Sequence, residues 1–374
     1  MKVPIREKRG HISFCSFLEI ACAILIMLSV SFSLYKMLWD TTNLPDLDLS
    51  RCPPLTSNPK RIWAYWHTGI KGMPLFVQQN MKMWKVVSPD WEIRSLQGDD
   101  PNNECHISNF VPPEMLPKYF DQMLVQKQSD SARLAVMRVH GGVYMDCTIL
   151  LFEPLEMNYW HFVDRNLTDP SRKAMVGHYY EWYSLPGRKD GFEIWMIVAK
   201  AQEPLIVAWH DLFLKLLEEG PKPFIRNETT GELNPLFKGV NFSKIDQPYI
   251  EYGVSTTCLH ALLQLNQTWN FTYEYGSIIR NVDDYAYKLD HEFNFDGDKT
   301  YEYFYNREKL SLENIKKMIY GIPLMKLTNH AKYVVDSRYD HWSNLHNNLG
   351  MVRINLLEKG KVWKEQGAWD YTFM

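Results

Sequence analysis

The alternation of apolar and polar positions begins abruptly at residue 60 and predicts a strand–helix–strand unit. Residues 61–66 read Arg-Ile-Trp-Ala-Tyr-Trp, an aromatic run typical of a buried strand. Residues 73–87 then carry apolar side chains at helical spacing, and residues 91–96 alternate as a second strand. A strand, a helix and a strand in this order predict the start of a parallel α/β sheet.

A second helix–strand unit follows a proline-rich loop. The pattern predicts a helix that Ser129 caps and that runs to about Val139. Gly141-Gly142 is expected to end this helix, and residues 143–145 are expected to form the third strand. Later apolar patterns predict one more strand and two more helices, over residues 192–199, 204–217 and 311–320.

The N-terminal region carries a different pattern, an apolar run from Phe17 to Tyr35 behind four basic residues. A run of about 19 residues is long enough to cross a bilayer, and its basic flank is expected to stay in the cytoplasm. We therefore predict four regions: a cytoplasmic tail (1–12), a transmembrane signal anchor (13–36), a stem (37–59) and a lumenal catalytic domain (60–374).

A cleaved signal peptide is the alternative interpretation of this segment, with Ser31-Phe32-Ser33 as a small-residue cleavage site. Apolar residues continue as far as Trp39, beyond that site, which favours the uncleaved anchor. Acceptor sites for N-glycosylation agree with a lumenal domain because all five follow the anchor, at Asn166, Asn227, Asn241, Asn266 and Asn270.

Cysteine content and net charge narrow the possible classes of protein. Four cysteines follow the anchor (Cys52, Cys105, Cys147 and Cys258), and three disulfide pairings are open. Cys147 is expected to be a buried free thiol. A hydrophobic content of 45% indicates a globular chain, and a formal net charge of -3 argues against general nucleic-acid binding.

The candidate functional residues lie mainly between residues 129 and 148. Asp130 and Arg133 lie one helical turn apart, a spacing that suits hydrogen bonds to sugar hydroxyls. Asp146 follows the third strand, and an acid at a strand end can hold a hard divalent cation. Trp66 ends the first strand; packing in the core and stacking on a base are equally open for it. Taken singly, each acid could also be an ordinary helix-start or turn residue.

This run resembles the sugar-binding region of DXD-containing glycosyltransferases, through the pattern S-D-x-x-R followed by G-G-V-Y-x-D. That group includes fungal initiating mannosyltransferases and lactosylceramide galactosyltransferases. The segments R-I-W-A-Y-W-H-T-G-I-K-G-M-P, S-P-D-W-E-I-R and P-L-M-K-L-T are more similar to the capsular polysaccharide synthesis protein family. The resemblance implies an α/β fold of the GT-A (Rossmann-like) type, a nucleotide-sugar donor (UDP- or GDP-hexose) and Mn²⁺ or Mg²⁺.

Carried over residue by residue, the resemblance implies that Asp130 and Arg133 contact the donor sugar and that Trp66 stacks on the base. Asp146 would be the first acid of the DXD element, bound to the metal and the diphosphate, so Asp146, Asp130 and Arg133 form the implied catalytic set. Thr148 stands where the second acid is usual and would be a weaker metal ligand. A late histidine often completes the metal shell, and the candidates here are His330, His341 and His346.

The sequence thus predicts a single-pass type II Golgi membrane glycosyltransferase. It would transfer a hexose from a nucleotide sugar to a glycan or glycolipid acceptor, with retention of configuration as the family implies and with no nucleic-acid partner. A non-catalytic relative that only binds sugars or nucleotide sugars is the alternative, because Thr148 replaces an acid. A lectin-like adhesion ectodomain is a third class.

Overall fold

The chain divides into Met1–Leu44 and Pro45–Met374, and every element described below belongs to the second unit. The computed structural model describes the following residues: 47–166, 169, 172–187, 191–220, 225–227, 230–245, 250, 252–265, 278–281, 286–287, 291–296, 299 and 322–327.

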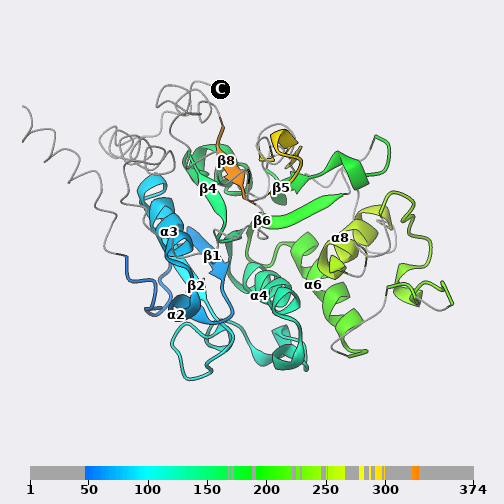
Figure 1. The fold of residues 1–374 in the computed structure, drawn as a ribbon, viewed down its shortest axis with the longest axis horizontal. Coiled ribbons are helices and arrows are strands. Elements are labelled where there is room, and N and C mark those ends of the chain that lie inside the picture. The colour runs from blue at the N-terminus through cyan, green and yellow to red at the C-terminus, as the bar shows by residue number, and fades with distance from the viewer. Residues whose placement is uncertain are drawn as a thin grey trace, which may run out of the picture. The chain divides into compact units, whose positions relative to one another are not determined.

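A six-stranded mixed sheet forms the centre of the fold (Figure 1). Strand β1 pairs in parallel with β2 and β3, whereas β6 runs antiparallel between β3 and β5, and β7 is parallel to β5. The predicted parallel start of the sheet is therefore confirmed for β1 and β2, but the whole sheet is mixed. In spatial order its strands are β2 (Glu92–Leu96), β1 (Arg61–Tyr65), β3 (Gly141–Met145), β6 (Phe192–Lys200), β5 (Met175–Tyr179) and β7 (Ile278–Asn281).

Helices cover the sheet, which explains why its central strands carry no polar alternation. Helix α4 packs on β1 and β3, and α4, α6 and α8 lie side by side (Figure 1). Every residue of β1 and β3 is buried, as expected for strands covered on both faces. The helices are α2 (Gly69–Gly72), α3 (Leu75–Val87), α4 (Val125–His140), α5 (His161–Val163), α6 (Pro204–Leu217) and α8 (Val254–Gln264).

A separate two-stranded ribbon joins distant parts of the chain. Strand β4 (Ile149–Leu151) pairs antiparallel with β8 (Leu324–Lys326), so that Ile149 lies opposite Lys326. Short helical turns complete the described elements: η1 (Ile107–Asn109), η2 (Pro113–Met115), η3 (Phe120–Gln122), η4 (Glu156–Trp160), η5 (Glu181–Tyr183) and η6 (Pro235–Phe237).

The two glycines after α4 turn the chain directly from helix into strand. Gly141 has φ +64° and Gly142 has φ +98°, conformations that L side chains rarely adopt. A Cβ atom at Gly141 would lie 2.3 Å from the backbone nitrogen of Ala201, and one at Gly142 would lie 2.6 Å from the carbonyl oxygen of Arg61. Only glycine fits both positions, and the predicted helix end at this pair is confirmed.

The predicted cap at Ser129 is wrong. Helix α4 begins at Val125, so Ser129 already has helical backbone, and Leu124 precedes the helix without any side-chain cap. The Ser129 hydroxyl lies 3.1 Å from the Tyr144 hydroxyl instead. The signal was misleading because an N-cap requires extended backbone at the capping residue, and here the helix starts one turn earlier.

The other predicted elements divide into confirmed ones and ones outside the described residues. The strand over 192–199 is β6, and the helix over 204–217 is α6. The helix predicted over 311–320 and the anchor predicted over 13–36 lie outside the described residues. Within the described part of the chain, no helix is long and apolar enough to cross a bilayer.

The structure resolves the cysteine pairing that the sequence left open. Cys52 and Cys105 form a disulfide, whereas Cys147 and Cys258 are buried free thiols. The expectation for Cys147 is confirmed. Burial raises the pKa of the Cys147 thiol to about 12, so it stays protonated and unreactive.

Candidate active site

The carboxyl ends of β1, β2, β3, β5 and β7 meet at one edge of the sheet, where open α/β folds place ligands. Asp146 lies at this edge, directly after β3. Its backbone N–H donates to the carbonyl oxygen of Trp195 in the neighbouring strand β6, at 2.8 Å. The carboxylate is therefore carried by the ordered end of the sheet rather than by a long loop.

Arg133 joins the two predicted acids. Its Nη1 donates to Asp130 Oδ1 and its Nη2 to Asp146 Oδ1, each at 3.0 Å, and its guanidinium carbon lies 4.5 Å from the centre of the Tyr144 ring. The Arg133 side chain is buried, with 5% of its surface exposed. Sequence reasoning thus selected three residues that the fold brings into direct contact, with one arginine held between two carboxylates.

The charges of this cluster are not fully balanced in the protein interior. Burial raises the pKa of Asp130 to about 6; Arg133 opposes this shift and Asp146 adds to it. Two carboxylates that share one guanidinium in a buried place compete for it, so one of them gains a proton more readily. Asp130 is therefore poised to change its charge near neutral pH.

Lys326 is the charged residue that sequence reasoning missed. Its ammonium donates to Thr148 Oγ1 at 2.8 Å and to the carbonyl oxygen of Leu327 at 3.0 Å, and it lies 3.5 Å from Asp146 Oδ2. The resemblance pointed to P-L-M-K-L-T as a family segment without giving its lysine a role. Only the pairing of β8 with β4 places that lysine beside Thr148.

The predicted metal ligands can be tested against these contacts. Thr148 is buried and its hydroxyl accepts from Lys326, while the two carboxylate oxygens of Asp146 face Arg133 and Lys326. Within the described residues, no group of three or more His, Cys, Asp or Glu side chains could hold a metal ion. This donor set does not fit a divalent cation, because cationic side chains already take its oxygens. The three candidate histidines, His330, His341 and His346, lie outside the described residues.

Trp66 lies at the same sheet edge, after β1. Its side chain is only partly buried and its indole N–H donates to the carbonyl oxygen of Gly72 at 3.2 Å. The indole is thus fixed beside the edge without being part of the core. Its accessible position leaves stacking on a base as a prediction. Tyr252, just before α8, was not predicted; partial desolvation and the nearby carboxylates of Asp130 and Asp146 raise its pKa, although 62% of its surface is exposed.

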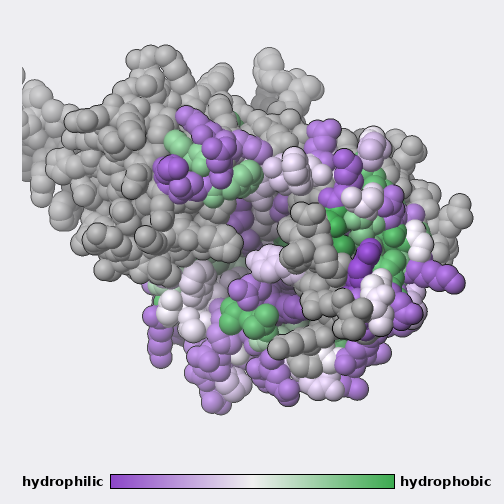
Figure 2. All heavy atoms as spheres, turned by 45° about the vertical axis from the view of Figure 1, so that its right-hand side comes forward, coloured by the Kyte–Doolittle hydropathy of each residue, from purple (hydrophilic) through white to green (hydrophobic). Residues whose placement is uncertain are grey.

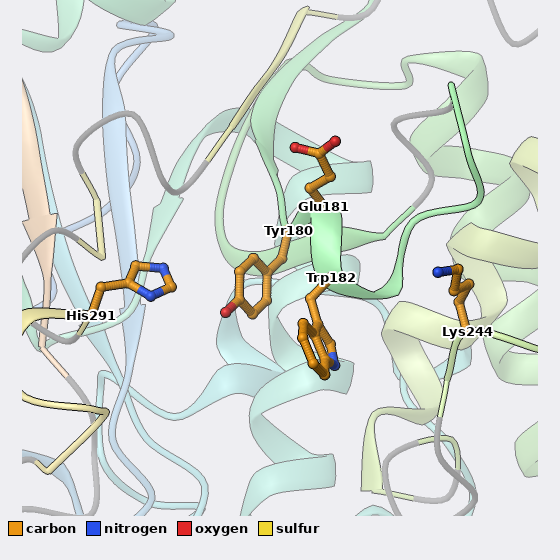
Figure 3. Close-up of a pocket in the computed structure, with 5 residues that line it drawn as sticks. All are labelled: Tyr180, Glu181, Trp182, Lys244 and His291. Atoms are coloured by element: carbon orange, nitrogen blue, oxygen red, sulfur yellow. The ribbon is translucent and has the colours of Figure 1, made fainter.

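A separate, open pocket of about 390 Å³ is lined by Tyr180, Glu181, Trp182, Lys244 and His291. Figure 3 shows the Tyr180 ring between His291 and Trp182, with Lys244 farther along the wall. Trp182 is the most exposed large apolar side chain of the described residues, at 76%. On the face brought forward in Figure 2, the described apolar residues gather in a few small groups between hydrophilic ones.

A short chain of contacts connects this pocket to Asp146. The Trp195 carbonyl accepts from the Asp146 N–H, and the Trp195 indole donates to the Tyr287 hydroxyl at 3.0 Å. The Tyr287 ring in turn meets the Tyr180 ring edge-on, with centroids 5.9 Å apart. The pocket residue Tyr180 is therefore linked to Asp146 through Tyr287 and Trp195.

Comparison with known proteins finds a matching family. Residues 45–225 match the model of the family described as capsular polysaccharide synthesis protein, which confirms the resemblance predicted from the sequence. The matched segment contains β1, α4 and β3, and with them Asp130, Arg133 and Asp146.

The relatives found by sequence are glycosyltransferases. The chain is 26% identical to O-glycosyltransferase PaGT of Phomopsis amygdali over 236 residues, which cover 58% of this chain and 56% of that one. It is 30% identical to glycosyltransferase afumC of Aspergillus fumigatus over 190 residues, covering 48% and 46% respectively. The chain thus matches only about half the length of these curated relatives.

Among solved structures, the galactosyltransferase LgtC in complex with donor and acceptor sugar analogues is similar over 82% of this chain and 99% of that one. The TM-score is 0.35 at 13% sequence identity, a likeness that supports no further conclusion.

Proposed function

We propose that this protein is a glycosyltransferase that transfers a hexose from a nucleotide-sugar donor to a hydroxyl group of a glycan or glycolipid. The observation that carries the proposal is the Asp130–Arg133–Asp146 bridge at the carboxyl edge of the sheet. The O-glycosyltransferases among its relatives support a hydroxyl acceptor. Retention of configuration remains the implication of the family resemblance.

The bridge assigns a task to each residue. Asp130 and Arg133 present a carboxylate and a guanidinium from one face of α4, and together they can bind neighbouring hydroxyls of a sugar. Asp146 fixes Arg133 from the opposite side and thereby orients it. Trp66 offers an accessible indole for the base at the end of β1. The site holds and orients the donor, which is where a transferase gains much of its rate.

The test is donor cleavage by wild type and by Asp146→Asn against a panel of UDP- and GDP-hexoses. We expect release of free hexose by wild type and at least a tenfold lower rate in the variant, because a neutral amide holds Arg133 more weakly than a carboxylate does. Asp211→Asn is a matched control, because Asp211 is an exposed residue of α6 that pairs with Arg138 of α4. Equal rates in Asp146→Asn and wild type would contradict the assignment.

The pocket lined by Tyr180 and Trp182 is proposed to bind the acceptor. Its residue Tyr180 is linked to Asp146 through Tyr287 and Trp195, and its exposed Trp182 offers an apolar face on which a sugar ring can stack.

Trp182→Ala is therefore expected to raise the KM for the acceptor by roughly fivefold, which corresponds to the loss of about 1 kcal/mol of aromatic contact. Donor hydrolysis without acceptor is expected to stay unchanged, because Trp182 is not part of the acid cluster. Leu55→Ala, which removes another exposed apolar side chain ahead of β1, serves as the control. A parallel loss of donor hydrolysis in Trp182→Ala would contradict an acceptor role.

The second candidate function is a non-catalytic protein that binds sugars or nucleotide sugars. Thr148 in place of an acid and the contact between Thr148 and Lys326 favour it, since they remove the usual metal pair. Tight binding of a nucleotide sugar with no turnover of any donor, with or without Mn²⁺, would establish this second function.

We further propose a Golgi lumenal location behind a single type II anchor. The Cys52–Cys105 disulfide supports an oxidising compartment, and the acceptor asparagines Asn166 and Asn241 are exposed. Glycosidase treatment of the expressed protein is expected to increase its electrophoretic mobility, and an unchanged mobility would count against the lumenal location.

A further inference from the structure

The position of Lys326 is set by backbone contacts from three sides. The antiparallel pairing of β4 and β8 places Lys326 opposite Ile149, and the N–H of Leu327 donates to the Thr148 carbonyl at 3.2 Å. The N–H of Lys326 itself donates to the carbonyl oxygen of Ala286 at 3.0 Å. A residue 178 positions away from Thr148 is thus held against it by the fold rather than by a flexible tail.

The ammonium of Lys326 occupies the space between the two predicted metal ligands. It lies 2.8 Å from Thr148 Oγ1 and 3.5 Å from Asp146 Oδ2, and its side chain is 7% exposed. A Mn²⁺ or Mg²⁺ ion bound to the same two oxygens would need distances of about 2.0–2.6 Å to both. Ion and ammonium would therefore compete for the same oxygens and repel each other.

The charges around the proposed donor position indicate what the Lys326 ammonium does. Asp130 and Asp146 supply two carboxylates, and both pair with the single guanidinium of Arg133. Without a further positive charge, the cluster would carry excess negative charge and repel an anionic diphosphate. Lys326 supplies that charge from within the chain, and a lysine is a well-suited point charge for phosphate oxygens.

We propose that Lys326 takes the place and the charge of the divalent cation in this site, so that the protein binds its nucleotide diphosphate without metal. The proposal rests on the proposed function, because it assigns the diphosphate of the donor to this edge of the sheet. It replaces the expectation of Mn²⁺ at Asp146 and Thr148 with a built-in cation. It also gives Thr148 a reason to be a hydroxyl residue, since an acid is not required to hold an ammonium by hydrogen bonding.

The experiment measures nucleotide and metal binding separately in wild type and Lys326→Met, which has a similar length and no charge. Isothermal titration with UDP and GDP, in EDTA or in MnCl₂, follows the nucleotide, and the electron paramagnetic resonance signal of free Mn²⁺ follows the metal. For wild type we expect nucleotide affinities that agree within twofold in EDTA and in MnCl₂. For Lys326→Met we expect at least a tenfold weaker affinity in EDTA.

Two further variants serve as controls. Lys326→Arg keeps the positive charge and is expected to bind nucleotide in EDTA within a few-fold of wild type. Lys85→Met removes a half-buried lysine of α3 that donates to the carbonyl oxygen of Trp91, and is expected to leave nucleotide binding unchanged. Circular dichroism of each variant shows whether the fold is retained.

The Mn²⁺ measurement tests whether Lys326 replaces the metal even if no nucleotide binds. Wild type is expected to leave the Mn²⁺ signal unchanged, whereas the double variant Thr148→Asp with Lys326→Met is expected to bind one equivalent, because an acid then faces Asp146 without an ammonium. Stoichiometric Mn²⁺ binding by wild type, or a tenfold gain in nucleotide affinity on adding MnCl₂, would overturn the inference. Absence of binding for both nucleotides in wild type would count against the proposed function alone.

Discussion

Arg133→Met is expected to lower the free energy of unfolding by about 3–5 kcal/mol and to abolish donor cleavage. Arg133 is the shared partner of Asp130 and Asp146, and its removal leaves two carboxylates facing each other at a buried place. The methionine cannot donate to either carboxylate, so both lose a charge-assisted hydrogen bond, although Asp146 keeps the Lys326 ammonium at 3.5 Å. Urea unfolding followed by tryptophan fluorescence measures the loss.

The pH dependence of this loss separates the charge effect from a packing effect. In wild type the pKa of Asp130 is raised to about 6 from its ordinary value of 3.8, so the folded protein binds the proton more tightly than the unfolded chain. The stabilisation by this proton is complete below about pH 4 and is lost as the pH rises through about 6. Without Arg133 the pKa of Asp130 rises further, so Arg133→Met should be less destabilising at pH 5 than at pH 8.

Arg138→Met provides the control on the same helix. Arg138 pairs with the exposed Asp211, and a pair of this kind contributes at most about 1 kcal/mol. We expect Arg138→Met to keep donor cleavage and to cost less stability than Arg133→Met at pH 8, where the buried His210, whose Nδ1 lies 3.4 Å from Arg138, is neutral. A loss in Arg133→Met that is the same at both pH values would instead indicate a packing role for the arginine.

The sequence predicted the helices and strands whose buried positions form a regular local pattern. The buried runs of β1 and β6 and the amphipathic α3 and α6 have a clear period, and Gly141-Gly142 marks a turn that only glycine can make. The same local pattern predicted that Asp130, Arg133 and Asp146 lie close together. They lie on one helix and the strand that directly follows it, so a short connection fixes their proximity.

What the sequence could not predict depends on contacts between distant segments. Strand β8 is three residues long and is defined only by its pairing with β4. Its local sequence therefore gave no sign that Lys326 is a neighbour of Thr148. Strand β5 is five residues long and all but its last residue are buried, so it carries no polar alternation. The antiparallel direction of β6 and the choice of Cys105 as the partner of Cys52 were likewise decided by tertiary packing.

Removal of the Cys52–Cys105 disulfide is expected to cost about 4 kcal/mol of unfolding free energy. The bond closes a loop with a sequence separation of 53, and loop-closure entropy for that length gives this magnitude. It also ties the segment before β1 to the loop after β2, next to the contact between the Cys52 N–H and the Glu104 carboxylate at 3.0 Å. Urea unfolding of the double variant Cys52→Ser and Cys105→Ser measures the cost.

Dithiothreitol provides the internal control for this prediction, because the buried thiols Cys147 and Cys258 are already reduced. The reductant should lower the unfolding midpoint of wild type to that of the double variant, and it should leave the double variant unchanged. A wild-type midpoint that does not respond to reduction, or a double variant as stable as wild type, would contradict a stabilising disulfide. A confirmed effect would mean that the protein reaches full stability only in an oxidising compartment, which is the environment that the proposed lumenal location requires.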